Sequence, residues 1–97
     1  MVQILWTERA KEDLKNIAEF ISRDSVYYAE KQLDKLYESV EVLYEHSEIG
    51  RSVPEYEMPN LRQLLVSKYR LIYLIVDDSR IDIITVHHSA RILNLEI

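Results

Sequence analysis

The spacing of the apolar residues changes near the middle of this chain, from a helical pattern to a strand pattern, and few folds accommodate both. In the first half, apolar residues recur at steps of three and four, at Val26, Ala29, Leu33, Leu36, Val40 and Leu43. That spacing places them on one side of an α-helix. Residues 71–76 are apolar or aromatic at almost every position, which is typical of a central strand that is covered on both faces. We therefore expect a helical layer packed against a buried sheet.

The first half of the chain predicts a strand followed by two helices. Residues 2–6 form a short apolar run, and Thr7 can cap a helix whose apolar stripe extends to Ile21. A break at residues 23–25 follows, where Asp24 or Ser25 can cap the second helix. A break this short favours an antiparallel helical hairpin. The stripe on the second helix fits an internal core better than a dimerising coiled coil, because it covers only about three heptads.

The second half predicts three strands. Residues 47–60 form a loop that contains Gly50, Pro54 and Pro59. Strands are expected over residues 61–67, 69–77 and 81–88, with tight turns near Lys68 and over residues 77–80. The element order βααβββ predicts an α+β fold, with a helical hairpin on one face of an antiparallel β-sheet. We expect a single domain over residues 1–97, since 97 residues support one modest core.

Composition removes several classes of protein. The chain contains no cysteine, which excludes a disulfide framework and any thiolate metal site. Two adjacent histidines on a strand point to opposite faces and cannot share one ion, so no metal site is predicted. With one glycine there is no glycine-rich phosphate loop, and we expect no cofactor. No membrane-length apolar run and no signal peptide are readable, so we expect a cytoplasmic protein without membrane association.

The net charge of −5 is unevenly distributed along the chain. Residues 1–50 hold all the excess acid, whereas residues 51–97 contain six basic and six acidic residues. Long-range attraction to nucleic acid would be weak or adverse for such a chain, which argues against a general nucleic-acid binder.

Basic side chains interrupt the apolar strands of the second half. Arg62, Lys68 and Arg70 lie within the otherwise apolar residues 61–73, and Arg91 follows a strand that ends in His87 and His88. Cations and a protonatable ring at one rim of a sheet predict a site for an anionic group.

The motifs of this sequence resemble those of the RelE/ParE superfamily of bacterial toxins, which belong to type II toxin–antitoxin modules. The resemblance rests on motifs in the family's order over about nine tenths of the chain: Trp6-Thr7 before Asp13-Leu14, Gly50-Arg51 and Val53-Pro54-Glu55 in the loop, the strand Tyr69-Arg70-Leu71-Ile72-Tyr73, and Val86-x-His88-x-x-Arg91. The loop and the final His-x-x-Arg are more similar to the ParE, or plasmid stabilisation, side.

The resemblance implies one of two targets. ParE-like toxins bind and poison DNA gyrase, whereas RelE-like toxins are mRNA interferases that cut mRNA on the ribosome; a cognate antitoxin silences both. The expected function is gyrase inhibition, and enzyme activity stays open. Should the chain cleave mRNA, the catalytic residues would be Arg62, Arg70, His88 and Arg91. This chain lacks the lysine cluster of RelE-like nucleases and is acidic, whereas they are usually basic, which favours gyrase.

The same residues also have structural interpretations. Arg70 can pair with Glu55 or Asp82, Arg62 can be a solvated strand residue, and His88 can cap the turn that follows its strand. His87 favours a packed, hydrogen-bonded role. The tail aliphatics Ile92, Leu93, Leu95 and Ile97 predict a covering partner, either the antitoxin or a second copy in a homodimer.

Overall fold

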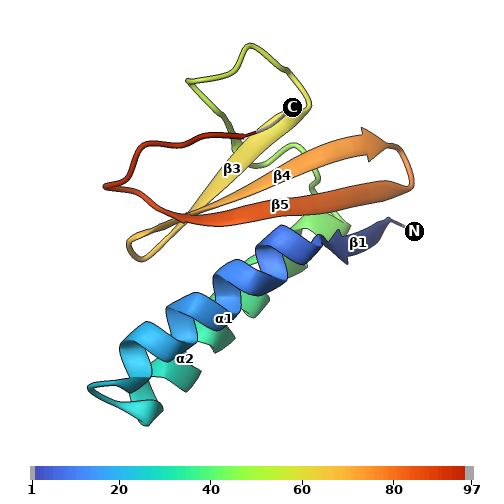
Figure 1. Ribbon diagram of the computed structural model, residues 1–97. Coiled ribbons are helices and arrows are strands. Elements are labelled where there is room, and N and C mark those ends of the chain that lie inside the picture. The colour runs from blue at the N-terminus through green and yellow to red at the C-terminus, as the bar shows by residue number, and fades with distance from the viewer. Residues whose placement is uncertain (1, 96–97) are drawn as a thin grey trace.

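The structure, a computed structural model, describes residues 2–95 and forms two layers (Figure 1). Its elements, in chain order, are β1 (Gln3–Trp6), α1 (Glu8–Ser22), α2 (Val26–Ser39), the 3₁₀ turn η1 (Glu41–Tyr44), β2 (Arg51–Ser52), β3 (Leu61–Val66), β4 (Tyr69–Asp77) and β5 (Arg80–His88). The predicted α+β class and the βααβββ order are confirmed. A two-residue strand, β2, lies within the expected loop and was not predicted, because two residues carry no readable alternation.

The sheet has the strand order β1-β5-β4-β3-β2. Strand β4 lies at its centre between β3 and β5, as its apolar sequence predicted. Both of those neighbours pair with it antiparallel, whereas β1 pairs with β5 in parallel. The sheet is thus antiparallel except at this one edge, which the expected antiparallel sheet did not include.

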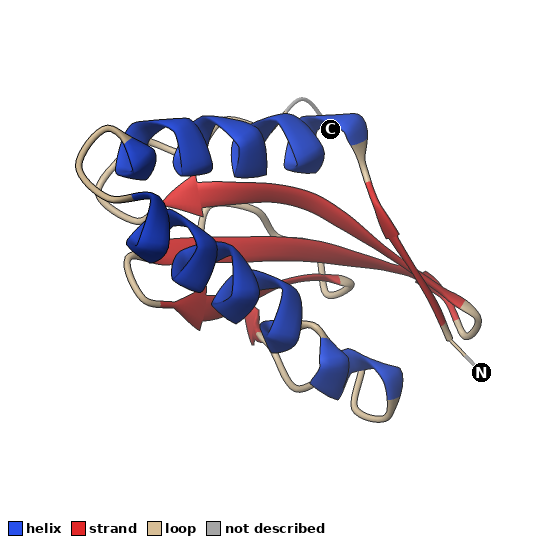
Figure 2. Cartoon of the chain, turned by 90° about the horizontal axis from the view of Figure 1, so that it is seen from below, coloured by secondary structure: helices blue, strands red, loops and turns tan. Residues whose placement is uncertain are grey.

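Both helices lie on one face of the sheet (Figures 1 and 2). Each begins at a side-chain cap: Thr7 Oγ1 accepts from the amide of Ala10, and Ser25 Oγ accepts from the amide of Tyr28. Ser25, and not Asp24, is therefore the cap of α2. The Thr7 hydroxyl also lies 2.8 Å from the carbonyl of Ile83 on β5, so it anchors the start of α1 to the sheet.

The apolar stripe of the second helix packs inside the molecule. Leu36, Val40 and Leu43 are buried together with Tyr73 of β4 and Ile83 of β5. The internal core is confirmed over the dimerising coiled coil for these positions, although Val26 at the start of the stripe remains 62% exposed. The helix itself ends at Ser39, and Leu43 reaches the core from η1.

A second apolar cluster covers the opposite face of the sheet. Its buried members are Val53, Leu61, Ile72, Leu93 and Leu95. The expectation that a partner covers the tail aliphatics is wrong for Leu93 and Leu95, because the chain buries them against its own sheet. Ile92 is 95% exposed, and Ile97 lies outside the described residues.

Gly50 lies where the loop after η1 passes close to the sheet. Its amide donates to the Tyr73 hydroxyl at 2.9 Å, and that hydroxyl donates to the carbonyl of Ser47 at 2.7 Å. A Cβ at this position would lie 2.5 Å from the Tyr73 hydroxyl oxygen, so the approach requires glycine. No helix within residues 2–95 is long and apolar enough to cross a membrane.

Candidate functional site

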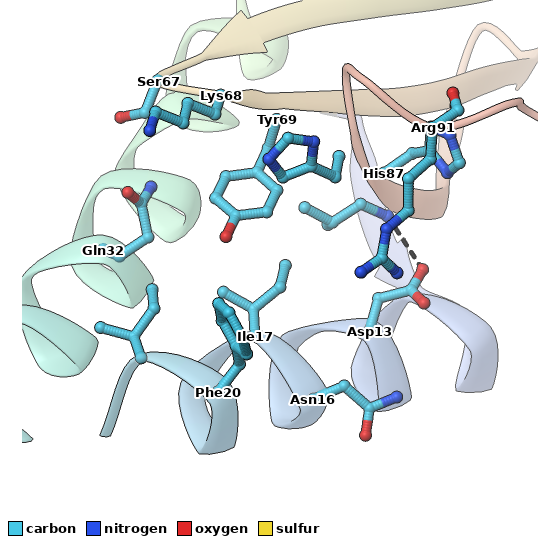
Figure 3. Close-up of a pocket in the computed structure, with 13 residues that line it drawn as sticks. Asp13, Asn16, Ile17, Phe20, Gln32, Ser67, Lys68, Tyr69, His87 and Arg91 are labelled. Atoms are coloured by element: carbon cyan, nitrogen blue, oxygen red, sulfur yellow. Dashed lines mark hydrogen bonds between the residues drawn. The ribbon is translucent and has the colours of Figure 1, made fainter. Parts of the chain in front are cut away.

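A hollow of about 580 Å³ lies between the helical hairpin, the β3–β4 turn and the end of β5 (Figure 3). Helix α1 supplies Asp13, Asn16, Ile17, Phe20 and Ile21, and α2 supplies Gln32. The turn and the start of β4 supply Ser67, Lys68 and Tyr69, and the end of β5 with the following turn supplies Val86, His87, His88 and Arg91. Chain segments distant in sequence therefore meet at this one place.

The turn that brings Lys68 to the hollow depends on Ser67. Ser67 adopts a positive φ of 55°, the left-handed conformation that closes the two-residue connection between β3 and β4. The amide of Ser89 donates to the carbonyl of Lys68 at 2.9 Å and ties the turn to the end of β5. The backbone carbonyl of Lys68 thus holds the turn in place, and its side chain lines the hollow.

Tyr69 and His88 stand side by side at the upper wall of the hollow. They oppose each other in the β4–β5 pairing, and their rings meet edge to face with centroids 5.6 Å apart. Burial raises the pKa of the Tyr69 hydroxyl, and the nearby positive charge of Arg91 opposes that shift only in part. The phenol is therefore a neutral hydrogen-bond donor at physiological pH.

The ring of His88 also holds the turn after β5. Its Nδ1 accepts a hydrogen bond from the amide of Ala90 at 3.1 Å. This is the capping role that the sequence left open beside a site role, and the residue fulfils it while it lines the hollow. Because Nδ1 is an acceptor here, the remaining ring nitrogen Nε2 carries the proton of the neutral imidazole.

Asp13 connects α1 to the end of β5. Its Oδ2 accepts hydrogen bonds from the Thr85 hydroxyl and from the amide of Val86, the latter at 3.1 Å. Among residues 2–95, this carboxylate is the only acidic side chain that lines the hollow. Sequence analysis placed it in a family motif without assigning it a role, and nothing in its helical position indicated this contact with β5.

Arg70 lies away from the hollow, in a clamp on the other face of the sheet. Its guanidinium binds both carboxylate oxygens of Glu55, at 2.7 and 2.8 Å, and its Nε donates to Gln63 at 2.7 Å. The residue is only 8% exposed. Mutual hydrogen bonding lowers the pKa of Glu55 to about 2 and raises that of Arg70. The structural ion pair, one of the two interpretations left open, is therefore present, with Glu55 and not Asp82 as partner.

Arg62 is likewise engaged with the fold. Its guanidinium donates to the carbonyls of Glu48 and Gly50, at 2.9 and 3.0 Å, and so holds the loop after η1. It pairs with Tyr73 across β3 and β4, whereas Arg70 pairs with Leu65, so the two arginines project from opposite faces. The sequence left Arg62 as a solvated strand residue or a ligand, and neither interpretation includes this contact with the loop.

The four residues predicted for cleavage thus separate into two groups. His88 and Arg91 line the hollow, while Arg62 and Arg70 do not. His87 opposes Arg70 in the strand pairing and its Nε2 lies 2.9 Å from the Arg91 carbonyl, as its hydrogen-bonded role predicted. Sequence analysis missed Gln32 and Asn16 at the hollow, since polar residues on helices usually face solvent.

Within residues 2–95 no group of three histidine, cysteine or acidic side chains is arranged to hold a metal ion. The polar groups at the hollow are instead mostly hydrogen-bond donors. This composition suits an anionic or acceptor-rich group.

Three comparisons with known proteins bear on the identity of the chain. Residues 4–93 match the family model described as "ParE toxin of type II toxin-antitoxin system, parDE". The chain is 32% identical to Toxin RelE2 of Caulobacter vibrioides over 92 residues, which cover 95% of this chain and all of that protein.

Among solved structures, the chromosomal ParDE toxin–antitoxin system from P. aeruginosa has the same fold, with a TM-score of 0.74. The alignment covers 91% of this chain and 96% of that one at 23% identity. Since the family model spans nearly the whole sequence, the chain belongs to the ParE toxin family of type II toxin–antitoxin modules.

Proposed function

We propose that this toxin inhibits growth by binding DNA gyrase and that it acts without chemistry of its own. The family implies a cognate antitoxin as partner. The observation that carries the proposal is the state of Arg70, the residue most suited to hold a scissile phosphate. Its guanidinium donates hydrogen bonds to Glu55 and Gln63, and the residue is buried.

The chemistry of RNA cleavage explains why this matters. Attack of a 2′-hydroxyl on the adjacent phosphate requires a base, an acid and cations close to the developing charge. Here Glu55 neutralises Arg70, and Arg62 is bound to carbonyls on the opposite face. A substrate phosphate would have to displace a bidentate carboxylate to reach Arg70. The net charge of −5 also opposes approach to ribosomal RNA.

Ribosome-dependent mRNA cleavage is the second candidate, because a different polar set surrounds the hollow. Lys68, Tyr69, His88 and Arg91 line it together, and they include cations and groups able to transfer protons. The relative from Caulobacter vibrioides also carries the name Toxin RelE2. In this alternative the catalytic residues would be those of the hollow and not Arg62 or Arg70.

The two candidates are tested with one protein preparation in two assays. We expect the toxin to inhibit DNA supercoiling by purified gyrase and its cognate antitoxin to relieve that inhibition. We expect mRNA in a purified translation mixture to remain intact at toxin levels equal to the ribosomes, as mapped at the 5′ ends.

Variants of the hollow decide which group acts if mRNA is cut. Tyr69→Phe and Arg91→Gln test the hollow, and Arg51→Gln is the matched control, since Arg51 is exposed on β2 and does not line it. Codon-positioned cuts that vanish in the first two variants and persist in the control would overturn the gyrase proposal. Supercoiling that stays normal at saturating toxin would also overturn it.

A further inference from the structure

We propose that the hollow beside the helical hairpin binds a nucleoside phosphate, either free or at the end of a strand. The inference does not depend on whether the toxin acts on gyrase or the ribosome. It is distinct from the Arg70 clamp, which lies on the other face of the sheet. Four features carry it: unpaired donors, a flat apolar wall, a fitting volume and the placement of charge.

The donors of the hollow are not used by the fold. Within residues 2–95 the amine of Lys68, the guanidinium of Arg91 and the hydroxyl of Tyr69 make no side-chain hydrogen bond or ion pair. The Nε2 amide nitrogen of Gln32 is buried and has no partner within the same residues. A buried donor left without a partner costs free energy, and an acceptor-rich ligand would satisfy it.

Aromatic and aliphatic side chains give the hollow a flat apolar wall. Figure 3 shows the Tyr69 ring above Ile17 and Phe20 of α1, with the space between them open. Phe20 is 65% exposed, which is unusual for a phenylalanine that only fills a core. A planar base placed against such rings gains stacking energy, whichever base it is.

The charges indicate how the ligand is oriented. Figure 3 places Lys68, Ser67 and Gln32 toward one end, and Arg91 and Asp13 toward the other. The phosphate belongs at the Lys68 end, because Asp13, whose carboxylate would repel it, lies at the opposite end. The base would then lie against Tyr69 and extend toward Arg91, whose guanidinium suits ring stacking and base acceptors.

The size of the hollow agrees with this ligand. A volume of about 580 Å³ falls within the range of small-molecule sites and is large enough for a mononucleotide.

The test measures binding of AMP, adenosine and inorganic phosphate to the full-length toxin by isothermal titration calorimetry. We expect AMP to bind saturably and more tightly than either of its parts. Lys68→Gln should weaken AMP about tenfold, to the level of adenosine, because it removes only the phosphate contact. Arg91→Gln should weaken AMP and adenosine alike, since it acts on the base. Arg51→Gln should change neither.

The source of the ligand is distinguished with a 5′-phosphorylated tetranucleotide. Binding at least as tight as that of AMP assigns the site to strand ends, and much weaker binding assigns it to free nucleotides. Three results would overturn the proposal. They are the absence of saturable binding at millimolar AMP, adenosine or phosphate binding with the same affinity as AMP, and a loss of AMP affinity in Arg51→Gln equal to that in Lys68→Gln. These assays contain neither gyrase nor ribosomes, so their failure leaves the target of the toxin untouched.

Discussion

At the scale of single residues, the sequence offered Glu55 or Asp82 as the partner of Arg70 but could not choose between them. Arg70 lies on a central strand with an apolar surrounding, so its charge requires compensation wherever it is buried. Glu55 supplies that compensation from a loop 15 residues earlier. Such a pairing depends on the path of a loop with two prolines, which periodicity does not specify.

We predict that Glu55→Gln destabilises the fold by about 1–2 kcal/mol at neutral pH, since Glu55 is 39% exposed and solvent screens part of the pair. The pKa of Glu55 in the folded protein, about 2, lies below its ordinary value of 4.5. The pair therefore stabilises the fold fully above pH 4.5 and loses that contribution as pH falls toward 2. Urea unfolding of both proteins across this range should show their difference shrinking on acidification. A difference that stays constant with pH would contradict the clamp.

We predict that Gly50→Ala costs about 1–3 kcal/mol, because the new methyl group collides with Tyr73 and with the carbonyl of Gln63. Tyr73→Phe removes the hydroxyl that lies nearest to the new methyl group. The double variant should therefore be more stable than the sum of the two single losses implies, as measured by urea unfolding. Strict additivity would mean that the hydroxyl does not cause the strain.

At the scale of elements, local chemistry predicted most of the helices and strands. The cap at Thr7 is confirmed, Ser25 of the two candidates caps α2, and the strands around the Lys68 turn are confirmed. Hydrogen bonds between near neighbours fix these boundaries, so they are readable from the sequence. The end of α2 was predicted too late, because the 3₁₀ turn continues the apolar spacing after the helix has ended at Ser39.

The two caps differ in what else they bind, which predicts unequal effects. Ser25→Ala should cost about 1 kcal/mol, the ordinary value for losing a cap. Thr7→Ala should cost about 2 kcal/mol, because the Thr7 hydroxyl also bonds the carbonyls of β5. Thr7→Ser, which keeps the hydroxyl, serves as the control. Thermal unfolding followed by circular dichroism would contradict this if the two alanine variants lost equal stability.

At the scale of the whole molecule, the sheet is covered by helices on one face and by the loop and tail on the other. Tyr56 connects these last two segments, because its hydroxyl accepts from the amide of Leu95 and donates to that residue's carbonyl, at 2.7 and 3.1 Å. Leu93 and Leu95 thus complete the second apolar cluster, whereas Ile92 remains exposed. The cognate antitoxin is therefore not needed to cover Leu93 and Leu95.

We predict that Tyr56→Phe loosens the tail without unfolding the domain. Hydrogen exchange at the amide of Leu95 should accelerate by about tenfold, in line with the loss of about 1–2 kcal/mol of hydrogen bonding. The amides of α1 should exchange as before. Tyr44→Phe is the matched control, since the Tyr44 hydroxyl has no partner among the described residues. Equal acceleration of exchange in both variants would show that the Tyr56 hydroxyl does not hold Leu95 specifically.

The sequence by itself determined the fold class, the order of elements and the cap of α1, because periodicity and near-neighbour hydrogen bonds are local properties. Its motifs, and not its periodicity, carried the resemblance to the family, which the family match then showed. It also indicated that His88 and Arg91 approach one another, since only two residues separate them. Only the tertiary structure decided that Arg62 and Arg70 project from opposite faces of the sheet, and that Glu55 is the ion-pair partner of Arg70. It also brought Lys68, Gln32 and Phe20 together at one hollow. These contacts join residues far apart in the chain, so their geometry depends on how loops and layers close in three dimensions.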